Sequence, residues 1–148
     1  MIDSELQRLK MAFRDRQTPS EWVCDNLDPL HAQFAADFVR EVESGCNRAD
    51  LFQSAIAYYS LLTDEARLFL LPDFLGTLIP YPHQAIYTVC AFESERGRAL
   101  LVSLTPAELD AVMRFIDSLS RREDMRPYSD EVHQLAALAE ASRKHRIR

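Results

Sequence analysis

Apolar residues recur along most of this 148-residue chain at the three- and four-residue spacing of an α-helix. The stripes predict amphipathic helices over residues 2–13, 30–42, 109–119 and 132–139. In the last of these we expect Val132, Leu135, Ala136 and Ala139 to face inward. Residues 50–62 are apolar on nearly all sides, which predicts a helix at the centre of the core.

Capping signals mark where helices begin. A side chain able to cap, followed by proline or acidic residues, occurs at Thr18, Asp28, Thr63, Thr105 and Ser129. The first of these signals predicts a short helix that carries Trp22 and ends near Asn26. Gly45 is placed to end the helix that follows Asp28, because glycine readily takes the left-handed conformation of a C-cap.

The sequence leaves two segments open. Pro72 either kinks one helix that runs to Ile79 or begins a new helix, and we favour the kinked helix. Residues 86–92 are rich in β-branched and aromatic side chains, so they also suit a strand that pairs with residues 100–103. We favour a helix there, because a lone two-stranded hairpin is only marginally stable.

The fold class that follows is all-α. We expect residues 1–148 to form one compact domain of six to eight helices, with a basic tail at residues 143–148. A short β-hairpin around residues 86–103 is the alternative that the pattern leaves open.

Charge narrows the choice of partner. The chain has 17 basic and 23 acidic residues, and the tail 143–148 alone holds four of the basic ones. The remaining body therefore has 13 basic residues against 23 acidic ones, a net charge of −10. Such a body repels phosphate backbones and attracts basic protein surfaces. We therefore expect a basic protein as the partner and no binding to nucleic acid.

Motifs for catalysis are missing from the sequence. The three glycines are too far apart for a phosphate-binding loop, and neither a nucleophile elbow nor a zinc-protease motif occurs. Cys24, Cys46 and Cys90 form no zinc-binding spacing, so reduced thiols are expected. We expect no enzyme activity, no cofactor and no metal.

The chain start has no signal-peptide pattern, and no run of about 18 uncharged apolar residues occurs. These features predict a cytoplasmic protein that does not enter a membrane.

Tyrosines and acids share the segment from residue 58 to residue 95. Aromatic side chains with polar tips are frequent at binding hot spots, although tyrosines and acids at the edge of a core give the same pattern. The candidate partner-binding residues are Tyr58, Asp64, Glu65, Asp73, Tyr81, His83, Glu93 and Glu95.

Three motifs between residues 60 and 119 are similar to those of a family of small bacterial helical proteins. They are Leu62-Thr63-Asp64-Glu65-Ala66, Leu70-Leu71-Pro72-Asp73-Phe74-Leu75 and Leu104-Thr105-Pro106-Ala107-Glu108. The family has a Tyr-Leu-Pro-Ala-Tyr-Leu-like core and a Leu-Thr-Pro-Glu helix start. This chain departs from it by lacking the tyrosine before the proline and an upstream aromatic motif that contains glycine. The resemblance implies a helical bacterial protein and carries over no catalytic residue.

The leading hypothesis is a non-enzymatic protein-binding domain. Its most concrete form is an immunity protein, which neutralises a bacterial toxin by covering the basic active-site cleft with acidic and tyrosine side chains. One alternative is an enzyme or small-ligand-binding protein with a site near His83 and Cys90. Another is a homo-oligomeric regulatory scaffold.

Overall fold

In a computed structural model, which describes residues 2–147, the chain folds into eight α-helices and three 3₁₀ helices with no β-strand among those residues. The α-helices are α1 (Ile2–Ala12), α2 (Pro29–Glu43), α3 (Arg48–Ala55), α4 (Asp64–Gly76), α5 (Ala85–Glu93), α6 (Glu95–Val102), α7 (Pro106–Ser120) and α8 (Ser129–Ile147). The 3₁₀ helices are η1 (Ile56–Leu61), η2 (Pro82–Gln84) and η3 (Glu123–Tyr128). The all-α prediction is confirmed. The alternative hairpin around residues 86–103 is wrong, because α5 and α6 occupy that stretch.

The described residues divide into two compact units. The terminal unit contains residues 2–15 and 82–147, so α1 joins the helices from α5 onward. The central unit is Arg16–Tyr81, with α2, α3, η1 and α4. The expectation of a single domain over residues 1–148 stays a prediction.

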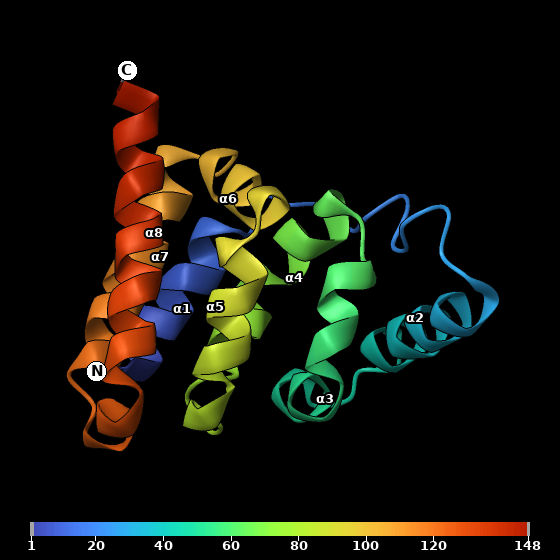
Figure 1. Ribbon diagram of the computed structural model, residues 1–148, viewed down its shortest axis with the longest axis horizontal. Coiled ribbons are helices and arrows are strands. Elements are labelled where there is room, and N and C mark those ends of the chain that lie inside the picture. Colours follow the sequence, from blue (N-terminus) through green and yellow to red (C-terminus); the bar gives the residue numbers. More distant parts are fainter. Residues whose placement is uncertain (1, 148) are drawn as a thin grey trace. The chain divides into compact units, whose positions relative to one another are not determined.

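In the terminal unit, helices far apart in sequence share one core. α1 packs against α7, α7 against α8, and α8 against both α5 and α6 (Figure 1). Leu9 of α1, Phe115 of α7 and Val132 of α8 are almost fully buried there. Ala136 is exposed, contrary to the expectation that it faces inward, because the buried stripe of α8 runs through Val132, Leu135 and Ala139.

Predicted caps are found at the ends of several helices. Thr105 accepts a hydrogen bond from the backbone N–H of Glu108, and the Glu108 carboxylate accepts one from the N–H of Thr105. Asp28 caps α2 and Thr63 caps α4. Gly45 follows α2 with a φ of +82°, the left-handed conformation that its position predicts.

In the central unit, aromatic rings form the core. Tyr59 and Phe74 are stacked with ring centroids 3.9 Å apart, and Phe52 meets both rings edge-on. The Tyr59 hydroxyl donates a 2.7 Å hydrogen bond to the carbonyl oxygen of Arg67. The Arg67 guanidinium lies over the Tyr59 ring at 5.1 Å from its centroid. Residues 50–62 therefore contribute to the centre of a core, as predicted.

The backbone of this stretch differs from the predicted continuous helix. α3 begins after Asn47, whose side chain accepts from the N–H of Asp50, and it ends at Ala55. Ala55 has φ −138° and ψ 33°, outside helical values, and the chain then tightens into η1. The break gives Tyr58 and Tyr59 separate surroundings, because Tyr59 enters the core while Tyr58 stacks on Phe34 of α2.

Pro72 lies inside α4, so the prediction of one helix through this proline is confirmed over Asp64–Gly76. The helix ends before Ile79, and residues 77–80 form a turn. The N–H of Tyr81 donates to the carbonyl of Thr77 at 3.0 Å.

The short helix predicted after Thr18 is wrong. Residues 16–27 contain no helix, because their polar groups bond across the unit. The N–H of Cys24 donates to the Leu61 carbonyl, the N–H of Thr63 donates to the Trp22 carbonyl, and Val23 and Leu62 form an isolated β-bridge. These tertiary bonds replace the local bonds of a capping box.

None of the helices within residues 2–147 has the length and apolar character that crossing a bilayer requires.

Candidate functional site

The eight predicted partner-binding residues are divided between the two units. Tyr58, Asp64, Glu65, Asp73 and Tyr81 belong to the central unit. His83, Glu93 and Glu95 belong to the terminal unit.

Most of the predicted residues in the central unit form contacts that stabilise the unit itself. The Asp73 carboxylate accepts a 2.7 Å hydrogen bond from Arg48 of α3. Glu65 accepts bonds from both the backbone N–H and the hydroxyl of Ser20, at 3.0 and 3.1 Å. These contacts fasten α3 and the segment before α2 to α4. Asp73 and Glu65 are therefore explained by folding alone.

The two tyrosines are likewise engaged. Tyr58 is half-buried, stacked on Phe34 with ring centroids 5.6 Å apart. The Tyr81 hydroxyl donates a hydrogen bond to Asp50, which raises the pKa of the phenol above its ordinary value of 10.0. Aromatic side chains that we expected to present to a partner thus serve mainly to pack the central unit.

Asp64, His83, Glu93 and Glu95 are exposed. Asp64 and Glu95 lie in the first turns of α4 and α6, where the helix dipole favours a carboxylate. Glu65 is exposed as well, but its carboxylate is bonded to Ser20.

The acidity of the chain is concentrated in the central unit. Residues 16–81 contain ten acidic and four basic residues, a net charge of −6, whereas the rest of the chain has 13 of each. Nine of the ten carboxylate residues are exposed, the exception being Asp73. The whole net charge of the protein therefore belongs to one unit.

Arginines of the central unit form ion pairs with some of its carboxylates. Arg40 and Arg48 pair with Asp37 and Asp73. Arg67 is 2% exposed and approaches Asp64 at 3.9 Å. Four exposed carboxylates of this unit form no ion pair and no side-chain hydrogen bond with the described side chains of residues 2–145: Glu21, Asp25, Glu41 and Glu43.

The alternative site near His83 and Cys90 stays a prediction. His83 lies in η2 and Cys90 follows seven residues later in α5. All three cysteines are free thiols, and Cys24 donates to the carbonyl of Leu62 at 3.1 Å. Among the described residues, no group of three or more His, Cys, Asp or Glu side chains is arranged to hold a metal ion.

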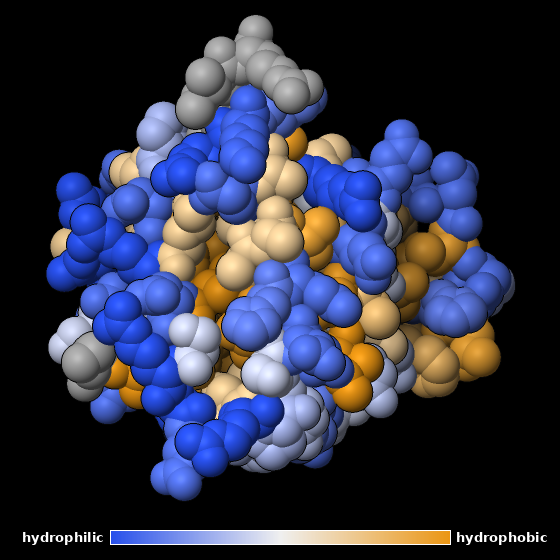
Figure 2. All heavy atoms as spheres, turned by 60° about the vertical axis from the view of Figure 1, so that its left-hand side comes forward, coloured by the Kyte–Doolittle hydropathy of each residue, from blue (hydrophilic) through white to orange (hydrophobic). Residues whose placement is uncertain are grey.

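The terminal unit has a groove that the sequence did not predict. It lies between α8 on one side and α5 and α6 on the other, with a volume of about 440 Å³. Figure 2 shows apolar side chains at the bottom of a hollow on the face that carries α8, with hydrophilic side chains around it. The lining residues are Val89, Glu93, Arg98, Val102, Gln134, Ala137, Leu138, Ala141, Ser142 and His145.

Of the predicted residues, Glu93 alone lines this groove. The other residues that line the groove come from α5, α6 and α8, and only the tertiary structure decides that these helices pack together. The apolar stripe predicted on α8 runs through Val132, Leu135, Ala136 and Ala139 and does not include Leu138, so no local pattern pointed to the groove.

Comparisons with protein-family models, with curated proteins and with solved structures found no match to this chain. The resemblance of residues 60–119 to a family of small bacterial helical proteins stays a prediction.

Proposed function

We propose that the protein acts without catalysis, by binding a basic protein on the anionic surface of its central unit. The observation that carries this proposal is the charge asymmetry: the net charge of −6 belongs to residues 16–81, with nine carboxylate residues exposed. A concentrated anionic surface speeds encounter with a cationic partner and disfavours acidic ones.

The structure changes which residues we assign to this surface. Asp73 and Glu65 hold the fold, so the carboxylates Glu21, Asp25, Glu41 and Glu43 take their place, and Asp64 remains. The first four form no ion pair with a described side chain, so their charge is available for a partner. Tyr58 and Tyr81 contribute by packing within the unit.

The most concrete form of this function is an immunity protein. Toxin domains that act on nucleic acids have basic clefts, because their substrates are polyanions. An acidic unit of 66 residues, Arg16–Tyr81, is large enough to cover such a cleft and exclude substrate sterically. We place the protein in the cytoplasm of a bacterial cell, where such a toxin would act.

The experiment is capture of partners by the tagged full-length chain from its native lysate, at low and high salt. The test variant carries Asp25→Asn, Glu41→Gln and Glu43→Gln. The matched control carries Asp15→Asn, Glu123→Gln and Asp130→Asn, which removes the same charge from exposed positions of the terminal unit. We expect one basic, stoichiometric partner that the control retains and the test variant loses.

A captured partner with a toxin domain must then be inhibited by the wild-type chain and inhibited much less by the test variant. Equal binding to both variants, or binding that high salt leaves unchanged, contradicts the proposal. Recovery of the chain only with copies of itself favours the homo-oligomeric scaffold instead.

The groove of the terminal unit favours a second candidate function, the binding of a small ligand. Its volume lies in the range of ligand pockets, about 300–1,000 Å³. This candidate is independent of the anionic surface, because the groove belongs wholly to the terminal unit.

A further inference from the structure

The α5–α6–α8 groove combines an apolar floor with a small number of polar groups. Val89, Val102, Ala137, Leu138 and Ala141 supply the apolar surface. Two alanines one turn apart on α8 leave the floor open, because their side chains end at Cβ. The groove extends along α8 from Gln134 to His145, which is about 16 Å at 1.5 Å per residue. Its shape suits an elongated apolar molecule.

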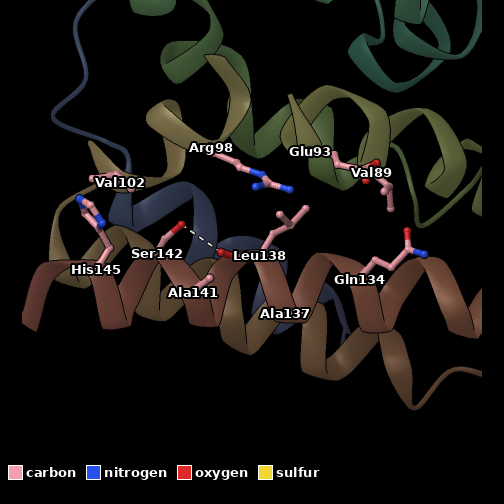
Figure 3. A pocket seen from close by; sticks show the side chains of 10 residues that line it. All are labelled: Val89, Glu93, Arg98, Val102, Gln134, Ala137, Leu138, Ala141, Ser142 and His145. Atoms are coloured by element: carbon pink, nitrogen blue, oxygen red, sulfur yellow. Dashed lines mark hydrogen bonds between the residues drawn. The ribbon is translucent and has the colours of Figure 1, made fainter. Parts of the chain in front are cut away.

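Arg98 supplies the central charge of this groove. Figure 3 shows its side chain reaching from α6 over the groove, with the guanidinium above Leu138. Among the side chains that the structure describes, those of residues 2–145, none forms an ion pair or hydrogen bond with this guanidinium. The cation therefore lies over apolar surface with its hydrogen-bond donors available to a ligand.

The chemistry of Arg98 selects a carboxylate. A guanidinium presents parallel N–H donors that match the two oxygens of a carboxylate in a bidentate pair. Beside the groove floor such a pair is screened less than it is in open water. Glu93, at the rim, carries a negative charge and disfavours ligands with several negative charges, such as phosphate esters.

The other polar groups are neutral or lie at the ends of the groove. Ser142 donates its hydroxyl to the Leu138 carbonyl at 3.0 Å, so the oxygen of this hydroxyl can still accept a bond. Gln134 lies at one end of the groove and His145 at the other (Figure 3). With one central cation and an apolar floor, we propose that the groove binds an aliphatic carboxylic acid of medium length. The carboxylate binds Arg98, and the chain lies on the floor along α8.

The first test compares three probes that share one aliphatic chain: octanoate, octanol and octylamine. Binding to the full-length protein is followed by calorimetry and by NMR shifts of α5, α6 and α8. We expect octanoate to bind saturably at one site, octanol to bind at least about tenfold more weakly, and octylamine weakest. Equal binding of octanoate and octylamine overturns the proposal, and so does octanoate binding outside these helices.

Matched variants then locate the site. Arg98→Leu is expected to weaken octanoate binding at least about tenfold, whereas Arg126→Leu, which removes an exposed arginine of η3, leaves it unchanged. Ala141→Leu fills the floor and is expected to abolish binding, whereas Ala136→Leu changes an exposed alanine of α8 outside the groove. Leucine and alanine both favour helices, so both variants are expected to fold.

Circular dichroism of each variant checks that α8 is intact. If Ala141→Leu and Ala136→Leu bind octanoate equally, the groove is not the site. If Ala141→Leu instead alters the oligomeric state, the groove is a contact between copies of the chain, and the ligand proposal is overturned. Neither result affects the proposed binding of a basic protein to the central unit, because that test uses other residues.

Discussion

At the residue scale, identical side chains that are neighbours in the sequence differ in how deeply their polar groups are buried. Tyr58 and Tyr59 are neighbours, yet Tyr59 is 1% exposed and bonds to the Arg67 carbonyl, whereas Tyr58 is half-buried. Losing a buried hydrogen bond costs more than losing a bond that water can replace. The hydroxyl group of Tyr59 therefore contributes more to the stability of the fold than the hydroxyl group of Tyr58 does.

We predict that Tyr59→Phe lowers the free energy of unfolding by about 1–3 kcal/mol, because it keeps the stack on Phe74 but removes the donor to the Arg67 carbonyl. Tyr58→Phe is the matched control, with an expected change within about 0.5 kcal/mol. Urea unfolding followed by the fluorescence of Trp22, which lies in the same unit, measures both. Equal effects of the two substitutions would show that the buried hydroxyl does not stabilise the fold.

Asp28 predicts a pH dependence of α2. The backbone N–H of His31, and then its imidazole, lower the pKa of the Asp28 carboxyl below its ordinary value of 3.8. A lowered pKa means that the cap contributes fully above that ordinary value and is lost as the pH falls through the lowered value. Asp28→Asn keeps an acceptor that does not titrate.

The variant Asp28→Asn is therefore expected to lose less stability than the wild type between about pH 5 and pH 2. Asp25→Asn, at an exposed carboxylate nearby, is expected to keep the wild-type profile. Urea midpoints measured across this range test the difference. A wild-type profile in Asp28→Asn would rule out this carboxylate as a source of acid sensitivity.

At the element scale, the junction of α5 and α6 depends on one glycine. Ser94 ends α5 and caps α6, and its hydroxyl accepts from the N–H of Gly97. A Cβ on Gly97 would lie 2.0 Å from the carbonyl oxygen of Ala91 and 2.7 Å from the Cα of Phe92. Both atoms belong to the backbone of α5, so they cannot yield as a flexible side chain does. Because α5 and α6 form one side of the groove, this glycine also sets the groove's shape.

We predict that Gly97→Ala destabilises the terminal unit by about 1–3 kcal/mol or more, because the added methyl overlaps backbone atoms of α5. It should also weaken octanoate binding. Gly45→Asn is the control: asparagine takes a φ of +82° more readily than most residues do, and beyond the chain neighbours no atom lies within 4 Å of the added Cβ. Urea unfolding followed by circular dichroism compares the two. Comparable stability of both variants would mean that α5 and α6 can separate without cost.

At the scale of the whole molecule, charge distinguishes the two units. The central unit bears all of the net charge, with exposed carboxylates concentrated within 66 residues, Arg16–Tyr81. Like charges repel one another in a folded unit, and mobile ions screen that repulsion over a Debye length of about 10 Å at 0.1 M salt. The terminal unit, with equal numbers of acidic and basic residues, has no such net repulsion.

We predict that raising sodium chloride from about 20 to 300 mM stabilises the central unit, because screening weakens the repulsion among its carboxylates. The urea midpoint read from Trp22 fluorescence should rise with salt. The midpoint should rise less in the variant with Asp25→Asn, Glu41→Gln and Glu43→Gln, which has less charge to screen. A midpoint that falls with salt would show that attractive pairs such as Arg48–Asp73 outweigh the repulsion.

The sequence by itself determined the fold class and most helix starts, because both depend on local physics. Apolar spacing predicts which face of a helix is buried, and caps such as Asp28, Thr63 and Thr105 bond to backbone groups within three residues. Local patterns also indicated that residues 50–62 supply a core, although they did not predict the break at Ala55.

Only the tertiary structure decided where long-range hydrogen bonds replace local ones. It also decided which residues far apart in the sequence come into contact. The segment after Thr18 has a helix signal, yet its backbone bonds to residues 61–63, because those partners become available when the unit folds. Glu65 and Asp73 look like surface acids until their bonds to Ser20 and Arg48 are formed. The groove residues span positions 89 to 145, so no local pattern could reveal them. Helix packing alone brings Arg98 over an apolar floor.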